Sequence, residues 1–391
     1  SQIGTTLWRY GSGAMLKHVV TLPSPKTGRV DPVPGVVVEV AQNEGEVFEK
    51  WVRFINLTNP DGFTGYNIFG FDWKYLMDRD IAGRMGEDKE YYAGPKLAML
   101  KKLSRLISAN ARPNKSQLKS SAYGVNSFEV LDIPGRFQID LLPYFRREHK
   151  LESYKLDYVA EHFTGQRKDD LPPQEIFKKL GGDSADVAVV AKYCAQDSAL
   201  VIQLLRQQQI VPNLIEMAKV TRVPLDWLIT RGQQVKVFAQ IIHECQLQGF
   251  CVPYWGRNRQ QTTNADNNKF VGATVLKATT GAFMEKPVAG LDFASLYPSI
   301  MIAHNIDYSS IVLDDRYNHL PGVDYETVRW KDDANVSHSY TFVQNQKGIL
   351  PGMLEKLWRF RKQAKREMRE AAKRGDSLME AIYNGKQLAI R

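Results

Sequence analysis

Asp292 is the residue of this chain best suited to bind a metal ion, because it lies in an apolar segment, residues 288–293, that predicts a strand. The sequence ASLYP that follows, at 294–298, predicts a sharp turn into a helix. Backbone N–H groups in such a turn can bind phosphate oxygens. A carboxylate that holds divalent ions beside such a turn suits phosphoryl transfer. A lone aspartate at a strand end is more often a turn cap, so these residues alone leave both interpretations open.

A strongly basic segment later in the chain could bind the phosphates of a nucleotide. Residues 355–374 contain nine Lys or Arg residues and three Glu residues. Arg361 and Lys365 are four residues apart, so a helix would place them on one face. Most of these cations also fit an ordinary solvated helix surface.

Two widely separated aspartates form a third candidate site. Asp72 ends the sequence GYNIFGFD, which predicts a strand followed by a helix. Tyr193 and Asp197 lie four residues apart in a predicted helix and share one face. Two carboxylates and a tyrosine can hold two metal ions and orient an attacking water molecule. Taken singly, Asp72 fits a helix cap and Asp197 fits a solvated helix residue.

The sequence GLDFASLYPSI at 290–300 resembles the first palm motif of B-family DNA polymerases almost letter for letter. Its continuation, MIAHNI at 301–306, resembles the delta-like and viral branch of that family. The resemblance implies that Asp292 binds both catalytic metal ions and that the main-chain carbonyl of Phe293 assists it.

The same resemblance implies which residues hold the incoming nucleotide. The backbone amides of Ser295, Leu296 and Tyr297 would bind the triphosphate, and Tyr297 would lie under the sugar and exclude a ribose 2′-hydroxyl. The basic segment resembles the first finger helix of the family, in which the residues at the Arg361 and Lys365 positions hold the triphosphate.

Arg391 is the position at which the family pattern changes. The sequence GKQLAIR at 385–391 resembles the start of the second finger helix, which usually has a lysine at this point as a phosphate contact and proton donor. Arginine keeps the charge for the phosphate contact but hardly deprotonates. The proton-donor role is therefore in doubt here.

The two aspartate segments resemble the second and third motifs of a DEDDy-type proofreading exonuclease, the nuclease domain that is fused to these polymerases. By this resemblance Asp72 and Asp197 bind metal ions, and Tyr193 orients the attacking water with them. Asn67 would be a supporting polar contact near the primer end.

The resemblance covers nearly the whole chain in order. Further matching segments are GRFQIDLL at 135–142, KLESYKLD at 150–157 and RGQQVK at 231–236. The sequence FVGAT resembles a loop that contacts template DNA, here through Gly272 and Ala273, and glycine lets the backbone approach the phosphate chain. Residues 80–128 and 253–268 match poorly.

Two expected motifs fall outside the sequence. The first exonuclease motif would precede Ser1, and the second palm aspartate and the thumb would follow Arg391. We therefore expect a fragment of a longer enzyme, which by itself neither extends nor degrades DNA efficiently.

Alternating strand-like and helix-like segments predict a mixed α/β (α+β) protein. Strands are expected at 17–23, 36–40, 64–69, 273–278 and 289–293, and helices at 44–55, 72–77, 187–205, 224–249, 351–374 and 377–391. Residues 80–128 predict a long insertion or a peripheral hairpin. The resemblance implies a ribonuclease-H-like 3′–5′ exonuclease domain over 1–215, the first part of a palm over 216–348, and two antiparallel finger helices over 349–391.

Composition adds weaker constraints. The formal charge is +9 over 391 residues, which favours a polyanionic partner without requiring one. Cys194, Cys245 and Cys251 show neither a disulfide framework nor zinc-ligand spacing, which fits a reducing compartment. The sequence shows no secretory signal and no run of eighteen apolar residues, so we expect no membrane association and an intracellular location, in the nucleus or at a viral replication site in the cytoplasm.

The sequence therefore predicts template-directed nucleotidyl transfer with 3′–5′ proofreading in a full-length DNA polymerase, most simply one from a large DNA virus. The resemblance implies Mg²⁺ as cofactor, with Mn²⁺ as a substitute, and primer–template DNA, dNTPs, a sliding clamp and accessory proteins as partners. The alternatives are a catalytically inactive DNA-binding scaffold, a free-standing nuclease, and a protein-primed member of the same family.

Overall fold

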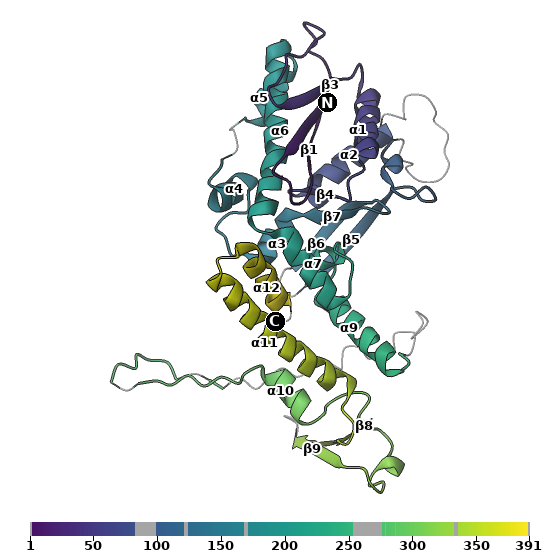
Figure 1. Ribbon diagram of the computed structural model, residues 1–391, viewed down its shortest axis with the longest axis vertical. Coiled ribbons are helices and arrows are strands. Elements are labelled where there is room, and N and C mark those ends of the chain that lie inside the picture. The colour runs from purple at the N-terminus through teal and green to yellow at the C-terminus, as the bar shows by residue number, and fades with distance from the viewer. Residues whose placement is uncertain are drawn as a thin grey trace. The chain divides into compact units, whose positions relative to one another are not determined.

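The computed structural model describes most of the chain and divides it into two compact units (Figure 1). The described residues are 2–82, 99–120, 124–167, 171–252, 276–277, 279–285, 287–331 and 335–389. The first unit, unit 1, combines residues 1–236 with 364–389, and unit 2 comprises residues 237–363. The two units contain both helices and strands, which confirms the expected mixed α/β class.

A three-stranded sheet forms one part of unit 1. Its strands are β1 (Gln2–Trp8), β2 (Met15–Thr21) and β3 (Val36–Val40), in the order β1-β2-β3. β1 and β2 are antiparallel, whereas β3 runs parallel to β2. The strands expected at 17–23 and 36–40 are confirmed.

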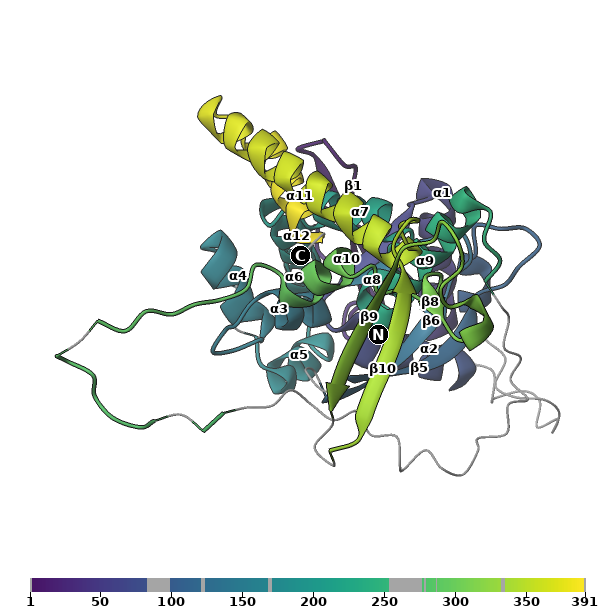
Figure 2. The ribbon, with the colours of Figure 1, turned by 90° about the horizontal axis from the view of Figure 1, so that it is seen from below.

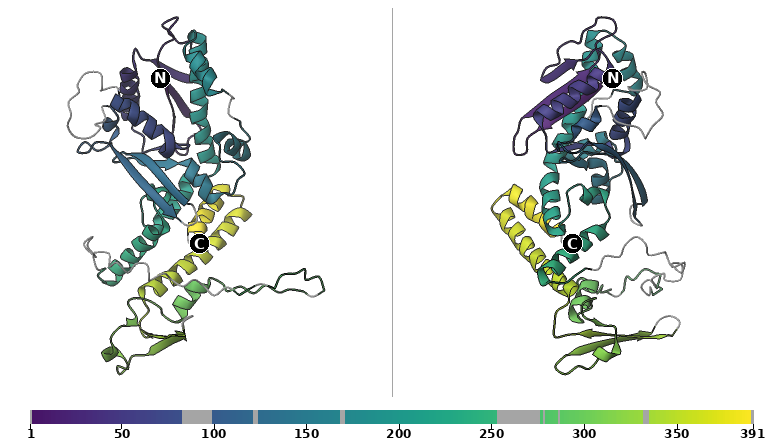
Figure 3. Two further views of the ribbon diagram at one scale, coloured as in Figure 1. Left: turned by 180° about the vertical axis from the view of Figure 1, so that it is seen from behind. Right: turned by 90° about the vertical axis from the view of Figure 1, so that its right-hand side faces the viewer.

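Two helices cover opposite faces of this sheet (Figure 3). They are α1 (Glu44–Thr58) and α6 (Ser184–Gln207). Side chains alternate between the two faces of a strand. Val19 accordingly packs with Ala191 and Ala195 of α6, whereas the neighbouring His18 stacks on Phe54 of α1.

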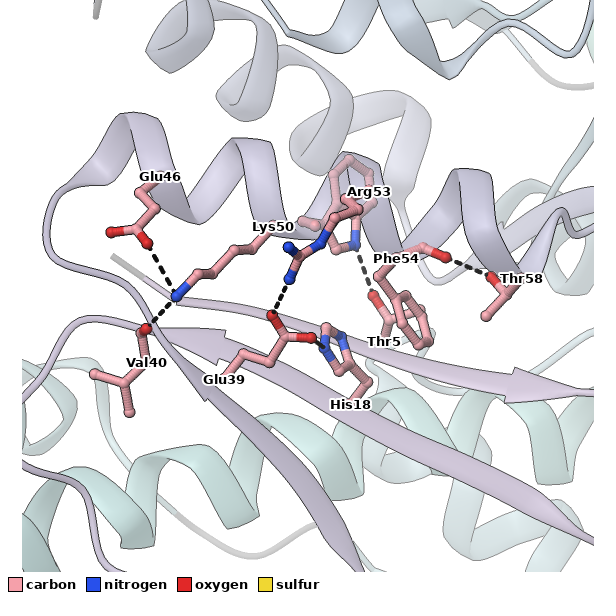
Figure 4. A network of polar contacts seen from close by, with 10 residues as sticks. Thr5, His18, Glu39, Val40, Glu46, Lys50, Arg53, Phe54 and Thr58 are labelled. Atoms are coloured by element: carbon pink, nitrogen blue, oxygen red, sulfur yellow. Dashed lines mark hydrogen bonds and ion pairs between the residues drawn. The ribbon is translucent and has the colours of Figure 1, made fainter.

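Polar contacts fasten α1 to the sheet (Figure 4). His18 Nε2 lies 3.1 Å from Glu39 Oε1, and its ring stacks on Phe54 with the ring centroids 3.9 Å apart. Arg53 donates to the other oxygen of Glu39 at 3.3 Å, and Lys50 donates to a backbone carbonyl of β3. These contacts hold α1 against the sheet. The chain then continues through residues 62–65 to the segment that contains Asp72.

A second, parallel strand pair positions the first candidate site. β4 (Gly62–Gly65) pairs with β7 (Phe137–Asp140), with Gly65 opposite Asp140. A short π-helix, η1 (Ile68–Asp72), and the helix α2 (Trp73–Ala82) follow β4. The strand expected at 64–69 is therefore too long, because Asn67 has a left-handed backbone (φ 66°) that ends the extended conformation.

The long polar region after α2 was expected to be an insertion or a peripheral hairpin, and its described part contains a hairpin. β5 (Arg112–Ser120) and β6 (Gly124–Asp132) form an antiparallel hairpin, as predicted for part of residues 80–128. Residues 83–98 lie outside the described part. The short helix η2 (Leu100–Leu103) is not peripheral, since Leu100 and Leu103 are both fully buried in the core.

Helices complete unit 1. They are α3 (Leu141–Glu148), α4 (Leu156–Thr164), α5 (Pro173–Leu180), α7 (Ile210–Thr221), α8 (Trp227–Thr230) and the start of α9 (Gln233–Gln248). The single helix expected at 224–249 is wrong, because Arg231 adopts an extended backbone and separates α8 from α9. A late helix, α12 (Ser377–Ala389), packs on α7. Gly385 is required at that contact, because a Cβ atom would lie 2.3 Å from Asn213 Oδ1.

Besides most of α9 and the start of the helix at 349–373, unit 2 consists mainly of one helix and one small sheet (Figure 2). The elements are α10 (Leu296–Ala303), β8 (Ile311–Val312), η3 (Asp315–Tyr317), β9 (Tyr325–Lys331) and β10 (Ser337–Val343), with the sheet order β8-β10-β9. The sheet is antiparallel. Residues 287–293 form no strand in the described chain, so the strand expected at 289–293 is wrong. Of the strand expected at 273–278, only 276–277 are described, and they are not extended into a sheet.

The helix α11 (Ile349–Lys373) confirms the predicted basic helix, and it ends at a tight turn before α12. Gly375 adopts the left-handed backbone (φ 71°) that ends helices. Asp376 Oδ1 then accepts the Met379 N–H at 3.1 Å and caps α12. The end of α11 and the start of α12 agree with the helix boundaries expected at 374 and 377.

Composition alone makes one described helix, α6, long and apolar enough to cross a membrane. Half of its apolar window is buried inside the protein, which is the pattern of a core helix. All three cysteines are free thiols, as their spacing predicted.

Candidate active sites

A buried carboxylate, Asp140, organises the first candidate site. It ends β7, caps α3, and is only 1% exposed. Its Oδ1 accepts the Asn67 N–H at 2.7 Å and the Leu142 N–H at 3.0 Å, and its Oδ2 accepts the Phe69 N–H at 2.9 Å. Burial raises the pKa of Asp140 to about 6, although these donors counteract the shift, and the nearby charge of Asp72 raises it further.

Asp72 is the last residue of η1 and remains exposed to solvent. Surrounding protein atoms still raise the pKa of its carboxyl group, because they partly displace the water that would stabilise the charge. The charge of Asp72 acts on Asp140, so the two carboxylates lie in the same part of unit 1.

The backbone between Gly65 and Asp72 follows a path that requires glycine. A Cβ atom on Gly65 would lie 2.2 Å from Ile68 Cγ2, and one on Gly70 would lie 2.4 Å from Asn67 Oδ1. The Asn67 carbonyl accepts N–H groups from Gly70 and Phe71 at 3.1 and 3.0 Å. Asn67 therefore lies at the start of the turn that places Asp72.

Tyr193 and Asp197 lie one turn apart on α6, as predicted. Close packing holds this helix against β1, since a Cβ atom on Gly4 would lie 2.4 Å from Cys194 Sγ. One turn further along the helix, Ser198 Oγ lies 2.7 Å from Thr6 Oγ1. Because α6 also packs against β4, the two aspartate-bearing segments meet at the same strand.

The structure does not by itself complete a metal site. In the described ranges, no group of three or more His, Cys, Asp or Glu side chains is arranged to hold an ion. Asp72 lies near Asp140, and Tyr193 and Asp197 lie on α6, which packs against β4. These residues do not form a complete set of metal ligands in the described part of the chain.

An aromatic pair beside Asp72 was missed by the sequence analysis. Phe71 and Tyr75 stack with ring centroids 5.9 Å apart and an interplanar angle of 10°, and both rings are exposed. The i, i+4 spacing of the two aromatics was the available signal. Exposed aromatic faces can stack on nucleobases.

The second candidate site lies in unit 2 at the start of α10. Ser295 adopts a left-handed backbone (φ 55°) and begins the helix, as the predicted sharp turn requires. The first N–H groups of a helix have no intrahelical acceptor, so those of Leu296 and Tyr297 can bind an anion. Asp292 is exposed in the preceding extended segment, and the Tyr297 ring is 73% exposed.

Arg361 and Lys365 lie on one face of α11, as predicted. Lys365 is exposed, whereas Arg361 is partly buried and its Nε has no hydrogen-bond partner. An anionic ligand would satisfy that donor. Gly272, Ala273 and Arg391 lie outside the described residues.

A polar cluster in unit 2, here called the α11 anchor, consists of the buried residues Asn305, Asp307 and Gly348 and the exposed Ser309. Asn305 is 3% exposed, accepts the Gly348 N–H at 2.8 Å, and donates to two backbone carbonyls at 2.7 and 2.8 Å. Asp307 accepts the first N–H of α11, from Ile349, at 2.9 Å. A Cβ atom on Gly348 would lie 2.7 Å from Asp307 Cβ. The anchor fixes α11 to the segment that follows α10.

Comparison with known proteins links the two candidate sites to one family. Residues 1–159 match the model for "DNA polymerase family B, exonuclease domain", and residues 223–391 match "DNA polymerase family B". Asp72 lies in the first match and Asp292, Arg361 and Lys365 in the second, whereas Tyr193 and Asp197 fall between the two.

Similar full-length proteins are viral and cellular polymerases. The chain is 35% identical to a DNA polymerase of Paramecium bursaria Chlorella virus NY2A over 100% of this chain and 41% of that protein. It is 32% identical to a DNA polymerase of Pyramimonas orientalis virus, over 94% of this chain and 35% of that protein. It is 35% identical to the DNA polymerase delta catalytic subunit of Glycine max, over 96% of this chain and 32% of that protein.

Proposed function

Because the chain belongs to DNA polymerase family B and matches its exonuclease and polymerase models in succession, we propose that it is part of a DNA-directed DNA polymerase with 3′–5′ proofreading. The observation that carries this proposal is the order of the two matches along one chain. The chain spans only about two fifths of the viral relative and a third of the plant relative.

The proposed domains are a ribonuclease-H-like exonuclease over 1–215, the first part of a palm over 216–348, and fingers over 349–391. The three-stranded sheet of unit 1, covered by α1 and α6, supports an α/β nuclease core. The basic helix α11 and the tight turn at Gly375 support a finger hairpin.

In the polymerase reaction, the primer 3′-hydroxyl attacks the α-phosphate of a dNTP and pyrophosphate leaves. Asp292 and the Phe293 carbonyl would hold Mg²⁺, which supplies Lewis-acid stabilisation of the phosphates when bound. The turn amides from Ser295 to Tyr297 hold the triphosphate together with Arg361 and Lys365, and Arg391 adds a further phosphate contact. The Tyr297 ring lies under the sugar and excludes a 2′-hydroxyl.

In the proofreading reaction, a mispaired primer end enters the nuclease site as a single strand. Asp72 and Asp197 would hold divalent ions, and Tyr193 helps to orient the water that attacks the terminal phosphodiester. Asn67 contacts the primer end, and Gly272 with Ala273 contacts the template between the two sites. The exposed Phe71 and Tyr75 rings offer stacking surfaces for the unpaired bases.

The proposed partners are primer–template DNA and dNTPs, with a sliding clamp and accessory proteins at an intracellular replication site. The plant relative is named a catalytic subunit, which indicates an assembly in that organism. The positive formal charge fits a nucleic-acid partner.

The two proposed sites predict separable losses in the full-length polymerase that contains this sequence. Asp292→Ala should reduce primer extension by about 1000-fold or more, because it removes a metal ligand used in the transition state. Degradation of a single-stranded primer should remain within about two-fold of the wild type. Primer extension with dNTPs and degradation without dNTPs measure the two activities.

A matched control is Asp314→Ala, which removes a partly exposed carboxylate that pairs with the exposed Arg316 in unit 2. It should leave both activities unchanged. Normal primer extension by the Asp292→Ala polymerase would reject the proposed palm site and favour a DNA-binding scaffold without polymerase activity.

A further inference from the structure

Asp140 differs from an ordinary helix cap because its carboxylate joins three separate pieces of backbone. One of its bonds caps α3 through Leu142, as a helix-capping aspartate usually does. The other two reach back about seventy residues along the chain, to the N–H groups of Asn67 and Phe69. Both carboxylate oxygens are thus engaged by N–H donors in a site that is almost closed to solvent.

These two long-range bonds act where the path of the chain is least regular. Asn67 holds a left-handed backbone, and Phe69 lies in the first turn of the π-helix η1. The first N–H groups of such a turn have no partners within the helix, so an external acceptor determines whether the turn is stable. Asp140 supplies that acceptor, and the turn ends at Asp72 five residues after Asn67.

The strand pairing strengthens this connection. Gly65 and Asp140 are register partners in the β4–β7 pair, so the carboxylate lies at the end of the strand from which the turn departs. The Asn67 carbonyl in turn accepts the N–H groups of Gly70 and Phe71. A continuous chain of hydrogen bonds therefore leads from Asp140 through Asn67 to the residue before Asp72.

We propose that Asp140 is a positioning residue of the exonuclease: its carboxylate fixes the turn that places Asp72, and it does not itself bind metal or DNA. This inference rests on the proposed nuclease function. Charge-assisted hydrogen bonds of this kind are stronger than neutral ones, and the buried N–H groups would be left unsatisfied without them. Three N–H donors and nearly complete burial leave no face of Asp140 open to a ligand.

Two substitutions separate the functions of this carboxylate. Asp140→Asn keeps the size but places an amide donor against backbone donors. Asp140→Ser keeps an acceptor short enough to cap α3, since serine is a good N-cap, but too short to reach Asn67 and Phe69. Either change should lower exonuclease turnover on single-stranded DNA about 10- to 100-fold, which is typical when a group supporting a metal ligand is removed.

The matched control is Asp80→Asn. Asp80 is also buried and also accepts backbone N–H groups, from Met99 and Leu100, but these bonds fix η2 rather than the Asp72 turn. It should cost stability without a specific loss of exonuclease activity. Primer extension by the same full-length protein reports on global folding and should stay within about two-fold in all three variants.

The decisive readouts are exonuclease turnover, the Mn²⁺ concentration that gives half of maximal exonuclease rate, and hydrogen–deuterium exchange over residues 62–77. We expect lower turnover, a higher half-saturating Mn²⁺ concentration and faster exchange for Asp140→Ser than for Asp80→Asn. Equal exonuclease rates in these two variants would overturn the inference. Full exonuclease activity in Asp72→Ala would instead reject the proposed nuclease site, so the two failures are distinguishable.

Discussion

Lys236 is a cation that the fold of unit 1 buries, since only 6% of it is exposed. Burial lowers the pKa of its ammonium group to about 8, and the neighbouring Arg147 lowers it further, whereas Glu148 acts in the opposite direction. Its Nζ lies 3.8 Å from the sulfur of Met217, a weak acceptor. The charge is therefore poorly compensated in the folded protein.

Lys236→Met should stabilise the folded protein at neutral pH, by about 3 kcal/mol for a shift of this size. The ordinary lysine pKa is 10.5, so the penalty is fully present below about pH 8 and disappears as the pH rises toward 10.5. The difference in denaturation midpoint between variant and wild type should accordingly be largest near pH 7 and shrink by about pH 10.

Lys219→Met is the control for this measurement, because Lys219 is an exposed residue that pairs with Glu216 on α7. It should change the midpoint little at any pH. A stabilisation by Lys236→Met that is independent of pH would contradict the account, because it would indicate a packing gain rather than relief of a buried charge.

Single residues were only partly predictable from the sequence. Asp72, Tyr193 and Asp197 could be selected as candidates because the short segments that contain them resemble family motifs. The role of Asp140 could not, since two of its three bonds depend on a pairing of β4 with β7 that brings together residues 73 positions apart. The sequence analysis saw Asp140 only as one letter in a matching segment.

The start of α11 depends on the α11 anchor described above. Asn305→Ala would leave the Gly348 N–H and two backbone carbonyls without a partner in a buried location. Each such loss costs about 1–3 kcal/mol, so unit 2 should be destabilised by about 3 kcal/mol or more. Because the same helix holds Arg361, we expect a higher KM for dNTPs with a smaller change in kcat.

Thermal unfolding and steady-state primer extension by the full-length polymerase test this expectation. Asn318→Ala serves as the matched control, because its side-chain amide bonds to Asp315 at the protein surface. If Asn305→Ala has the same stability and the same KM for dNTPs as Asn318→Ala, the anchor does not position α11.

Elements with strong local signals were predicted well. The helices α1, α6 and α11 show helical spacing of apolar residues, and Asp376 is a standard cap for α12. Predictions failed where local sequence gives no signal of a change in backbone conformation, as at the left-handed Asn67 and the extended Arg231. The apolar run at 289–293 also reads as a strand, but it pairs with no other described segment.

The whole chain presents two candidate sites for phosphodiester chemistry, one of hydrolysis and one of synthesis. Asp72, Tyr193 and Asp197 belong to unit 1, and Asp292 with Arg361 belongs to unit 2. The sequence predicted the family because long motif matches are specific, and the comparisons confirm it. The metal sites stay predictions, since no three-ligand group occurs in the described part of the chain. The proposed DNA and phosphate contacts Gly272, Ala273 and Arg391 also stay predictions, because they lie outside the described residues.

One reaction tests the central claim that the two sites serve synthesis and proofreading in the same enzyme. A primer with a mismatched 3′ end and a 5′ label is incubated with template, Mg²⁺, all four dNTPs and the full-length polymerase. The account predicts that the wild type removes the mismatch and then extends, that Asp72→Ala fails to remove it, and that Asp292→Ala shortens the primer without extending it. Removal of the mismatch by Asp72→Ala together with extension by Asp292→Ala would contradict the account.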